Sequence, residues 1–507
     1  MNLGGAWGAR NGYWLSLLLG LTSPVLLTGL NLPRRTPQPG VSAQNVADAQ
    51  LADEANGVDW LAYGRTYDGK RFSPIDQISF ADIGDLKVDW YTELPTNVGV
   101  GSTPLVAGGV MYFADSSNIV TAVNAKTGTI LWTYDSRAPE KAGDRMTPAV
   151  VHAGRGVALW KGRVYLATAA GRLVALDAKS GRESWSVNTF VPEELLHVVG
   201  VPITFHGKVL IGDAGSEDGN TRGYVTAYDA ETGAQTWRFY TLPSGEFTYD
   251  PEFNAIYIGT ANSIFALDAD TGQYRRHYQA RPADPGDSDS VGSMILADLK
   301  IKGREVKALM QASRNGLFYV IDRATGKLIS AKPYVKVIRA GKTDVTIGAG
   351  GAHDWQPISY NTNTGLVYIP ESEPSEVSRT PAASLLAWDP VHQSRAWEVS
   401  LNTNWSPGTL TTAGNLVFEG RTDGVLYAYD ATDGRVVWKY NLGLGIASPP
   451  MSYCINGLQY IALLVGWGGG FAADEGAATV NPGSQYNLQP RWLVAFSLQG
   501  SADYRPH

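Results

Sequence analysis

Short runs of alternating apolar and polar residues cover most of the chain. The segment GRVYLATAAGRLVALD (residues 162–177) is typical, because it holds two such runs separated by a turn of small residues. Alternation with period two places successive side chains on opposite faces of a β-strand. Patterns that favour helices are few. The sequence therefore predicts a chain built mainly of short strands joined by tight turns.

A motif that usually ends in tryptophan repeats along the chain. Its full copies are AVNAKTGTILW (122–132), ALDAKSGRESW (175–185), AYDAETGAQTW (227–237), ALDADTGQYRR (266–276), VIDRATGKLIS (320–330), AWDPVHQSRAW (387–397) and AYDATDGRVVW (428–438). A partial copy, LKVDW, ends at Trp90. With the alternating runs that precede them, the eight copies give about four strands per repeat unit.

Each copy combines residues with complementary roles at a hairpin. An Asp or Asn, such as Asp177, can hydrogen-bond the backbone of the following turn. A glycine such as Gly181 supplies the positive φ that a tight hairpin needs. The tryptophan is large and flat enough to fill the gap between adjacent sheets. These features predict a repeated four-stranded sheet that packs on its neighbours.

Eight repeats of four strands predict an all-β fold, an eight-bladed β-propeller with Trp-ending repeat motifs that spans residues 44–507 as one domain. The ring is expected to close by pairing WLVAFSLQG (492–500) with the strand near LKVDWYTELP (86–95). A solenoid is the alternative, but it would not need complementary segments at its two ends.

The first 43 residues differ from the rest. Residues 13–30 are apolar, follow Arg10, and lead to the small residues VSA before Gln44. This pattern resembles a secretory signal peptide with its cleavage site. An uncleaved N-terminal anchor that attaches the protein to a membrane is the alternative. Both predict a periplasmic or otherwise exported protein.

Charge and cysteine content exclude several classes of function. The net charge of −7 and the absence of basic runs longer than Arg34–Arg35 argue against a nucleic-acid partner. A single cysteine, Cys454, excludes a disulfide framework, a Cys-rich zinc site and a haem attached through two thiols. Its apolar surroundings predict a buried strand residue.

The segments RGVAL (155–159), GTLTTAGNLVFEG (408–420) and GWGGG (466–470) add a more specific likeness. With the repeat, they resemble the family of quinoprotein alcohol dehydrogenases, and the likeness runs from Trp60 to Ala472. In that family the propeller holds pyrroloquinoline quinone (PQQ) at its centre. The resemblance implies an enzyme that oxidises an alcohol and passes electrons to an external acceptor such as a cytochrome c or a membrane quinone.

The resemblance also assigns site residues. It implies Ca²⁺ or a lanthanide ion bound by four residues: Glu217, Asn262, Asp287 and Asp289. Asp289 occupies the position where some members carry an extra carboxylate associated with a lanthanide, and a trivalent ion favours more negative charge. Asp287 matches the general base that takes the proton of the substrate hydroxyl.

Four further residues match contacts to PQQ: Arg155, Arg314, Asp354 and Trp467. Arg314 matches the arginine that donates to the quinone oxygens and stabilises charge during reduction. Arg155 matches a contact to a PQQ carboxylate. Without the resemblance, either arginine could form an ordinary salt bridge between blades, and the acidic loops could simply be solvated.

The chain also departs from the family pattern. Ala149 and Val150 stand where the family has a vicinal cysteine pair, and the loop after Tyr240 is too short for the tryptophan that forms the floor of the cofactor site. Two hypotheses follow: a divergent, shortened PQQ-dependent alcohol dehydrogenase, or a non-catalytic propeller of the cell envelope that acts as a scaffold or binding protein.

Overall fold

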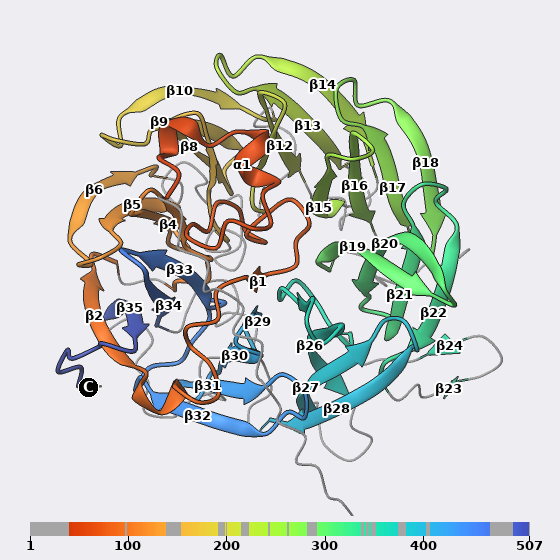
Figure 1. The fold of residues 1–507 in the computed structure, drawn as a ribbon. Coiled ribbons are helices and arrows are strands. Elements are labelled where there is room, and N and C mark those ends of the chain that lie inside the picture. Colours follow the sequence, from red (N-terminus) through yellow and green to blue (C-terminus); the bar gives the residue numbers. More distant parts are fainter. Residues whose placement is uncertain are drawn as a thin grey trace, which may run out of the picture. The chain divides into compact units, whose positions relative to one another are not determined.

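Strands of two to nine residues make up nearly all of the regular structure in the computed structural model of the protein (Figure 1). The structure describes residues 40–96, 99–137, 154–190, 198, 200–213, 223–241, 244–260, 263–280, 292–335, 339–340, 344–345, 351–373, 382–401, 406–466 and 490–505. All of them belong to the second of two units, 1–36 and 37–507, into which the chain divides. Within these described stretches, no helix has the length and apolar character needed to span a membrane.

Eight sheets form the blades of a propeller, as the repeat predicted (Figure 1). Blades 2 to 4 are β3 (Leu105–Ala107), β4 (Val110–Ala114), β5 (Ile119–Asn124), β6 (Ile130–Asp135); β7 (Ala158–Trp160), β8 (Arg163–Thr168), β9 (Arg172–Asp177), β10 (Glu183–Asn188); and β11 (Ile203–Phe205), β12 (Lys208–Asp213), β13 (Tyr224–Asp229), β14 (Gln235–Tyr240). Blades 5 to 7 are β15 (Ser244–Asp250), β16 (Ala255–Thr260), β17 (Ser263–Asp268), β18 (Tyr274–Gln279); β19 (Met294–Ile301), β20 (Arg304–Ala312), β21 (Leu317–Asp322), β22 (Leu328–Pro333); and β25 (Ser359–Asn361), β26 (Leu366–Glu373), β27 (Ala382–Asp389), β28 (Ser394–Ser400).

The remaining two blades contain strands from distant parts of the sequence. Blade 8 comprises β1 (Phe72–Ser73), β29 (Thr409–Thr412), β30 (Leu416–Gly420), β31 (Val425–Asp430) and β32 (Val436–Asn441). Blade 1 comprises β2 (Lys87–Leu94), β33 (Met451–Ile455), β34 (Leu458–Val465) and β35 (Arg491–Ser497). Outside the blades are the hairpin β23 (Arg339–Ala340) and β24 (Asp344–Val345), the 3₁₀-helices η1 (Ala43–Asn45) and η2 (Ile83–Asp85), and α1 (Asp48–Leu51).

The ring closes through blade 1, at the segments that the sequence predicted. Strand β2 pairs antiparallel with β35, from Lys87 opposite Ser497 to Leu94 opposite Arg491. An N-terminal strand thus forms the outer edge of a sheet whose other strands come from the C-terminal region (Figure 1). This pairing confirms a closed ring and excludes the solenoid. Cys454 lies buried in β33, as predicted.

Most seams between blades use the repeated tryptophan and glycine. A Cβ atom added at Gly181 would lie 2.5 Å from the Trp132 ring of the preceding blade. The Trp132 indole also donates a hydrogen bond of 3.1 Å to the Ala178 carbonyl. The same glycine–indole contact recurs at four other seams, formed by the pairs Trp90–Gly128, Trp185–Gly233, Trp237–Gly272 and Trp397–Gly434. The glycine is therefore required both by its positive φ and by the indole that covers it.

Two of the seams that lack the tryptophan–glycine contact have packing that explains why the repeat motif differs in these copies. At the seam between blades 5 and 6, the Arg276 side chain covers Gly326 and donates to the carbonyl of Arg323. Between blades 6 and 7, Ser330 stands in place of tryptophan, and the facing turn residue is Gln393 with φ of 56°. Trp388 fills this seam instead, with its ring 5.9 Å from that of Phe318. A turn that faces no indole can therefore have a residue other than glycine at this position.

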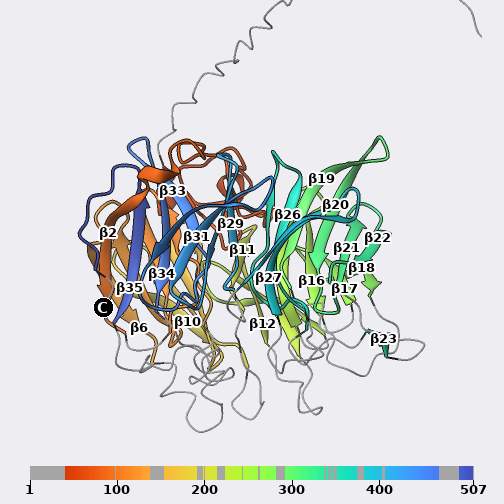
Figure 2. The ribbon, with the colours of Figure 1, turned by 90° about the horizontal axis from the view of Figure 1, so that it is seen from below.

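Residues 43–73, which we call the strap, cross one face of the ring and contact all eight blades (Figures 1 and 2). Strap atoms hydrogen-bond the backbone of seven blades, at Cys454, Val106, Gly162, His206, Leu296, Tyr360 and Thr411. In the remaining blade, Tyr249 meets the strap residue Tyr67 edge to face at 4.8 Å. One segment thus links every sheet of the propeller.

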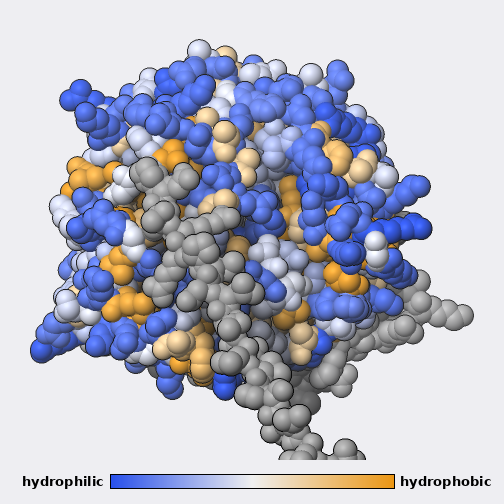
Figure 3. Space-filling view, viewed as in Figure 1, coloured by the Kyte–Doolittle hydropathy of each residue, from blue (hydrophilic) through white to orange (hydrophobic). Residues whose placement is uncertain are grey.

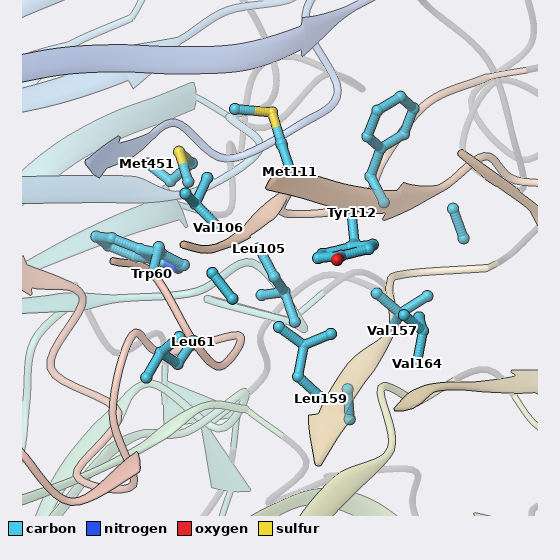
Figure 4. Packing of buried hydrophobic residues seen from close by; sticks show 14 of the residues in the cluster. Trp60, Leu61, Leu105, Val106, Met111, Tyr112, Val157, Leu159, Val164 and Met451 are labelled. Carbon is cyan, nitrogen blue, oxygen red and sulfur yellow. The ribbon is translucent and has the colours of Figure 1, made fainter. Parts of the chain in front are cut away.

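The strap is held by buried side chains as well as by its backbone. Trp60 and Leu61 pack among the inner strands of blades 1 to 3 (Figure 4). Arg71 is buried and donates to the carbonyl oxygens of Tyr63, Thr409 and Pro450. Burial lowers the pKa of Arg71 to about 10, so its guanidinium stays charged at neutral pH. This charge joins the strap to the inner strands of blades 1 and 8.

The described surface on the strap side is mainly hydrophilic, and its apolar side chains lie in small separate groups (Figure 3). Isolated apolar residues are normal on a protein surface. The described residues of this face therefore give no sign of a large apolar interface.

We expect Gly434→Ala to destabilise the ring more than Gly207→Ala. Both glycines have positive φ, so each substitution introduces backbone strain of about 1 kcal/mol. Only at Gly434 would the new Cβ also lie 2.5 Å from the facing indole of Trp397; nothing lies within 4 Å at Gly207. The clash should add about 1–3 kcal/mol. Melting temperatures measured by calorimetry compare the two variants, and equal losses would contradict the role given to the indole.

Candidate functional site

The two faces of the ring carry different turns of each blade. In a four-stranded meander, the entry to the first strand and the turn between the second and third strands lie on one face. The turn between the first and second strands lies on the other. Lys161 and Gly162, in the β7–β8 turn, hydrogen-bond the strap at 2.8 and 2.7 Å. The strap therefore occupies the face of these turns, and we call the opposite face the site face.

The three predicted site residues that the structure describes belong to segments of the site face. Arg314 follows β20 in a turn between second and third strands, while Arg155 and Asp354 lie in the entries to β7 and β25. The other predicted residues lie outside the described residues: Glu217, Asn262, Asp287, Asp289 and Trp467. In the sequence, Glu217, Asn262 and Trp467 fall between the second and third strands of a blade, and Asp287 and Asp289 fall between the last strand of one blade and the first strand of the next. The topology thus brings the flanks of every predicted position to one face.

Arg155 meets a residue from the opposite side of the ring. Its guanidinium carbon lies 4.7 Å from the centre of the Trp355 ring, an arrangement typical of a cation–π contact. Arg155 leads into blade 3 and Trp355 into blade 7, and these blades are separated by three others in either direction. The two side chains therefore meet close to the axis of the ring. Arg155 is half-buried, whereas Trp355 is buried.

Arg314 and Asp354 lie close to the segment that leads from the predicted base. The side chain of Arg314 passes over Gly351, where an added Cβ would lie 2.1 Å from its Cγ atom. A Cβ at Gly292 would lie 3.4 Å from the Asp354 carbonyl and 3.0 Å from that of Ala312. Gly292 is the first described residue after Asp287 and Asp289. The entry to blade 6 therefore runs between the elements that carry Arg314 and Asp354.

Two hydroxyl groups beside these residues have unmet hydrogen-bonding capacity. Ser313 Oγ, next to Arg314, and Ser293 Oγ, next to Gly292, are buried and pair with no other atom in the described part of the chain. Buried polar atoms without partners are costly and often mark a place where a ligand or water binds. The two guanidinium groups and one flat indole of the site face suit a planar, anionic ligand with several oxygen atoms.

A small cavity separates this region from the strap. It has a volume of about 80 Å³ and lies between the strap and the inner strands of blades 3 to 7. Val157 and Pro357 line it, each two positions after Arg155 and Trp355 respectively. The arginine and the indole therefore lie between the cavity and the site face. The cavity is large enough for several water molecules.

A buried carboxylate supports the Arg155 segment from blade 2. Asp115 accepts hydrogen bonds from the backbone amides of Ser117 and Ile119 and from the hydroxyl of Thr96. The neighbouring Asn118 packs against Gly154, which precedes Arg155. Burial raises the pKa of Asp115 to about 6, although these hydrogen bonds oppose the shift. Asp115 is therefore a buried group that titrates near neutral pH.

The described residues do not by themselves contain a cluster of three or more acidic, histidine or cysteine side chains that could hold a metal ion. The four predicted metal ligands lie outside these residues. The ligand set thus stays a prediction from the sequence.

Sequence reasoning missed Trp355 and Asp115 as residues of this region. Trp355 lies in the segment HDWQP, directly after the predicted contact Asp354, and this neighbourhood could have marked it as a residue of the site. Its contact with Arg155 joins residues 200 positions apart and depends on closure of the ring. Asp115 follows a strand in blade 2, and nothing in its local sequence distinguishes it from a turn aspartate.

Comparison with known families gives a match over most of the chain. Residues 60–255, 259–338 and 377–461 match the family described as "PQQ: Glucose/ethanol/alcohol dehydrogenase, beta-propeller domain". These ranges contain all eight copies of the repeat.

Individual proteins support the same match. The quinohemoprotein alcohol dehydrogenase ADH-IIG of Pseudomonas putida is 38% identical over 90% of this chain and 79% of its own length. The 1-butanol dehydrogenase (cytochrome c) of Thauera butanivorans is 32% identical over 89% of this chain and 79% of its own. A solved europium-containing methanol dehydrogenase is 26% identical, with a TM-score of 0.78, and covers 89% of this chain and 99% of its own.

We expect the stability of the protein to fall between about pH 4 and pH 6 because of Asp115. Its pKa is raised from 3.8 to about 6 in the folded chain, so the folded state binds the proton more tightly than the unfolded state does. Raising the pH through this window therefore favours unfolding, by about 3 kcal/mol in total. Asp115→Asn should flatten this pH dependence, measured as melting temperature against pH. An unchanged slope would mean that Asp115 does not carry the proton.

Proposed function

Because the chain belongs to the family of PQQ-dependent glucose, ethanol and alcohol dehydrogenase β-propellers, we propose that it oxidises an alcohol with PQQ and a metal ion. The metal is Ca²⁺ or a lanthanide, and the electrons pass to an external acceptor. The proposal also places the enzyme outside the cytoplasm, on the basis of the apolar segment 13–30.

The observation that carries the proposal is the gathering of ligand-binding groups on one face of a propeller of this family. Arg155 lies at the axis on the Trp355 ring, and Arg314 and Asp354 border the segment that follows Asp287. Guanidinium groups can donate paired hydrogen bonds to the carboxylates and quinone oxygens of PQQ. The described residues therefore fit the cofactor that the family binds.

The residues of the chain have separate tasks in this proposal. Arg155 binds a carboxylate of the cofactor, and Arg314 donates to its quinone oxygens, which gain negative charge during the reaction. Asp287 accepts the proton of the substrate hydroxyl as a general base. When bound, PQQ supplies the hydride acceptor, while the protein orients the substrate and excludes water.

The metal site is proposed from the resemblance and from the properties of the four side chains. Glu217, Asn262, Asp287 and Asp289 offer oxygen ligands, which both Ca²⁺ and lanthanide ions prefer. The second carboxylate at Asp289 adds negative charge, which favours a trivalent ion. The europium-containing methanol dehydrogenase among the similar structures supports a lanthanide.

The acceptor in this proposal is a cytochrome c or a membrane quinone, since relatives of both kinds are similar to this chain: the Acetobacter aceti relative is named an alcohol dehydrogenase (quinone). The Thauera butanivorans relative carries the cytochrome c in its name, and this sequence has no pair of cysteines with which to attach a haem of its own. A soluble cytochrome and a membrane quinone can be compared directly as acceptors for the purified enzyme.

We expect the purified protein to bind PQQ in the presence of Ca²⁺ or La³⁺ and then to reduce an artificial dye when a primary alcohol is added. Asp287→Ala should abolish dye reduction, because the proton acceptor is lost, but should leave PQQ bound. Bound PQQ is measured by its absorbance after gel filtration. Asp298→Ala is the matched control, since Asp298 is an exposed carboxylate in β19 of the same blade. If no PQQ binds with either metal, the proposal is wrong; if Asp287→Ala stays active, the assigned base is wrong.

We expect Asp289→Ala to reduce La³⁺-supported activity more than Ca²⁺-supported activity. Removal of one carboxylate weakens the binding of a trivalent ion more than it weakens the binding of a divalent ion. The ratio of the two activities at saturating PQQ should shift towards Ca²⁺ by about tenfold or more. Equal losses with the two metals would contradict a lanthanide-specific role for Asp289.

A further inference from the structure

We propose that Trp355 is a positioning residue for the cofactor, which holds the Arg155 guanidinium at the axis of the ring. The inference rests on the proposed function, because it concerns how Arg155 meets PQQ. It assigns a role to a residue that the family match alone does not single out. It also makes cofactor affinity depend on a contact between opposite blades.

The backbone around Arg155 is fixed by close packing, and the Trp355 ring restrains its side chain. Gly154 lies against Asn118, where an added Cβ would be 2.4 Å from the amide nitrogen. Gly156 has φ of 150°, a conformation that other residues rarely adopt. These glycines fix where the Arg155 side chain begins. Its long, flexible stem would still lose considerable entropy when a ligand orders it.

The Trp355 ring supplies this restraint. An indole face attracts a guanidinium electrostatically, and the two planes can stack. At 4.7 Å the charge lies within range of the ring, and Trp355 is only 5% exposed, so little water weakens the attraction. Stacking on an indole covers a face of the planar guanidinium and not its edge, from which its N–H groups donate to carboxylates. The arginine is therefore ordered before the ligand arrives.

Trp355 is itself held firmly from blades 7 and 8. The amide of Asp354 donates to Gln356 Oε1 at 3.1 Å, and the amide of Thr409 donates to the Pro357 carbonyl at 3.1 Å. Pro357 packs against Gly408, where an added Cβ would lie 2.5 Å from the proline ring. The backbone on both sides of Trp355 is thus held in place, and its indole is buried, so it can support a flexible cation. Such preorganisation raises affinity because less order must be gained on binding.

The test measures PQQ binding directly, by equilibrium dialysis with Ca²⁺ present and without substrate. Trp355→Leu should raise the Kd for PQQ about tenfold, the size expected when a buried cation–π contact is lost. Trp355→Phe keeps an aromatic face and should raise it less than about threefold. Trp388→Leu is the matched control, since Trp388 is a buried tryptophan of the same blade that packs on Phe318 in the seam. Its Kd should stay within about twofold of the wild type.

A double-mutant cycle separates positioning from general destabilisation. In an Arg155→Met background there is no guanidinium to hold, so adding Trp355→Leu should change the Kd by less than about twofold. An equal effect of Trp355→Leu with and without Arg155 would overturn the inference, as would equal Kd values for Trp355→Leu and Trp388→Leu. If Trp355→Leu does not fold, Trp355→Phe and Trp355→His are compared with and without Arg155. An equal effect on the Kd in both backgrounds would again overturn the inference.

The outcomes also distinguish this inference from the proposed function. A wild-type protein that binds no PQQ overturns both. A wild-type protein that binds PQQ, together with a Trp355→Leu variant of unchanged affinity, overturns only the positioning role. A tenfold loss that disappears in the Arg155→Met background supports both.

Discussion

Packing of a tryptophan from one sheet on a glycine of the next is the interaction on which the ring depends. Each blade is a small sheet that cannot bury both of its faces alone, so stability must come from its neighbours. The indole fills the wedge between two twisted sheets, and its N–H reaches a carbonyl of the adjoining hairpin. At five of the eight seams this contact fixes the angle between blades. Eight such angles must add to a full turn before any residue can reach the axis from several blades.

The site and the strap lie on opposite faces of this ring and depend on it in different ways. The strap links six blades through hydrogen bonds of its backbone and the other two through the side chains of Asp48 and Tyr67, and Arg71 anchors it with a buried charge. The site face presents side chains from separate blades to a common axis. Arg155 and Trp355 show this most directly, because their contact exists only when blades 3 and 7 face each other. The ring therefore creates a ligand-binding surface that no single blade contains.

Local patterns in the sequence were sufficient to predict the architecture. Alternating runs, glycine turns and tryptophan endings predicted the strands and the eight blades, because they recur along the chain, and complementary segments near the two ends predicted the closure of β2 on β35. Substitutions within the pattern were harder to interpret. Arg276 replaces an indole yet still covers the facing glycine, and Gln393 is tolerated because Ser330 faces it. Such exchanges can be explained only once the neighbouring blade is known. The strap contacts and the Arg155–Trp355 pair could not be predicted from local sequence, since they join segments far apart in the chain. The family resemblance supplied the candidate residues, of which Arg155, Arg314 and Asp354 lie on the site face.

Closure by strands from the two ends of the chain has a consequence for how the protein acquires its structure. Strand β2 is synthesised early, but its partner β35 follows about 400 residues later. During that interval β2 presents an unpaired edge, which other extended chains could join. Contacts between such distant segments also slow the final step of folding. A nascent chain of this protein would therefore benefit from being kept unfolded, or bound by a chaperone, until its last strand has been made.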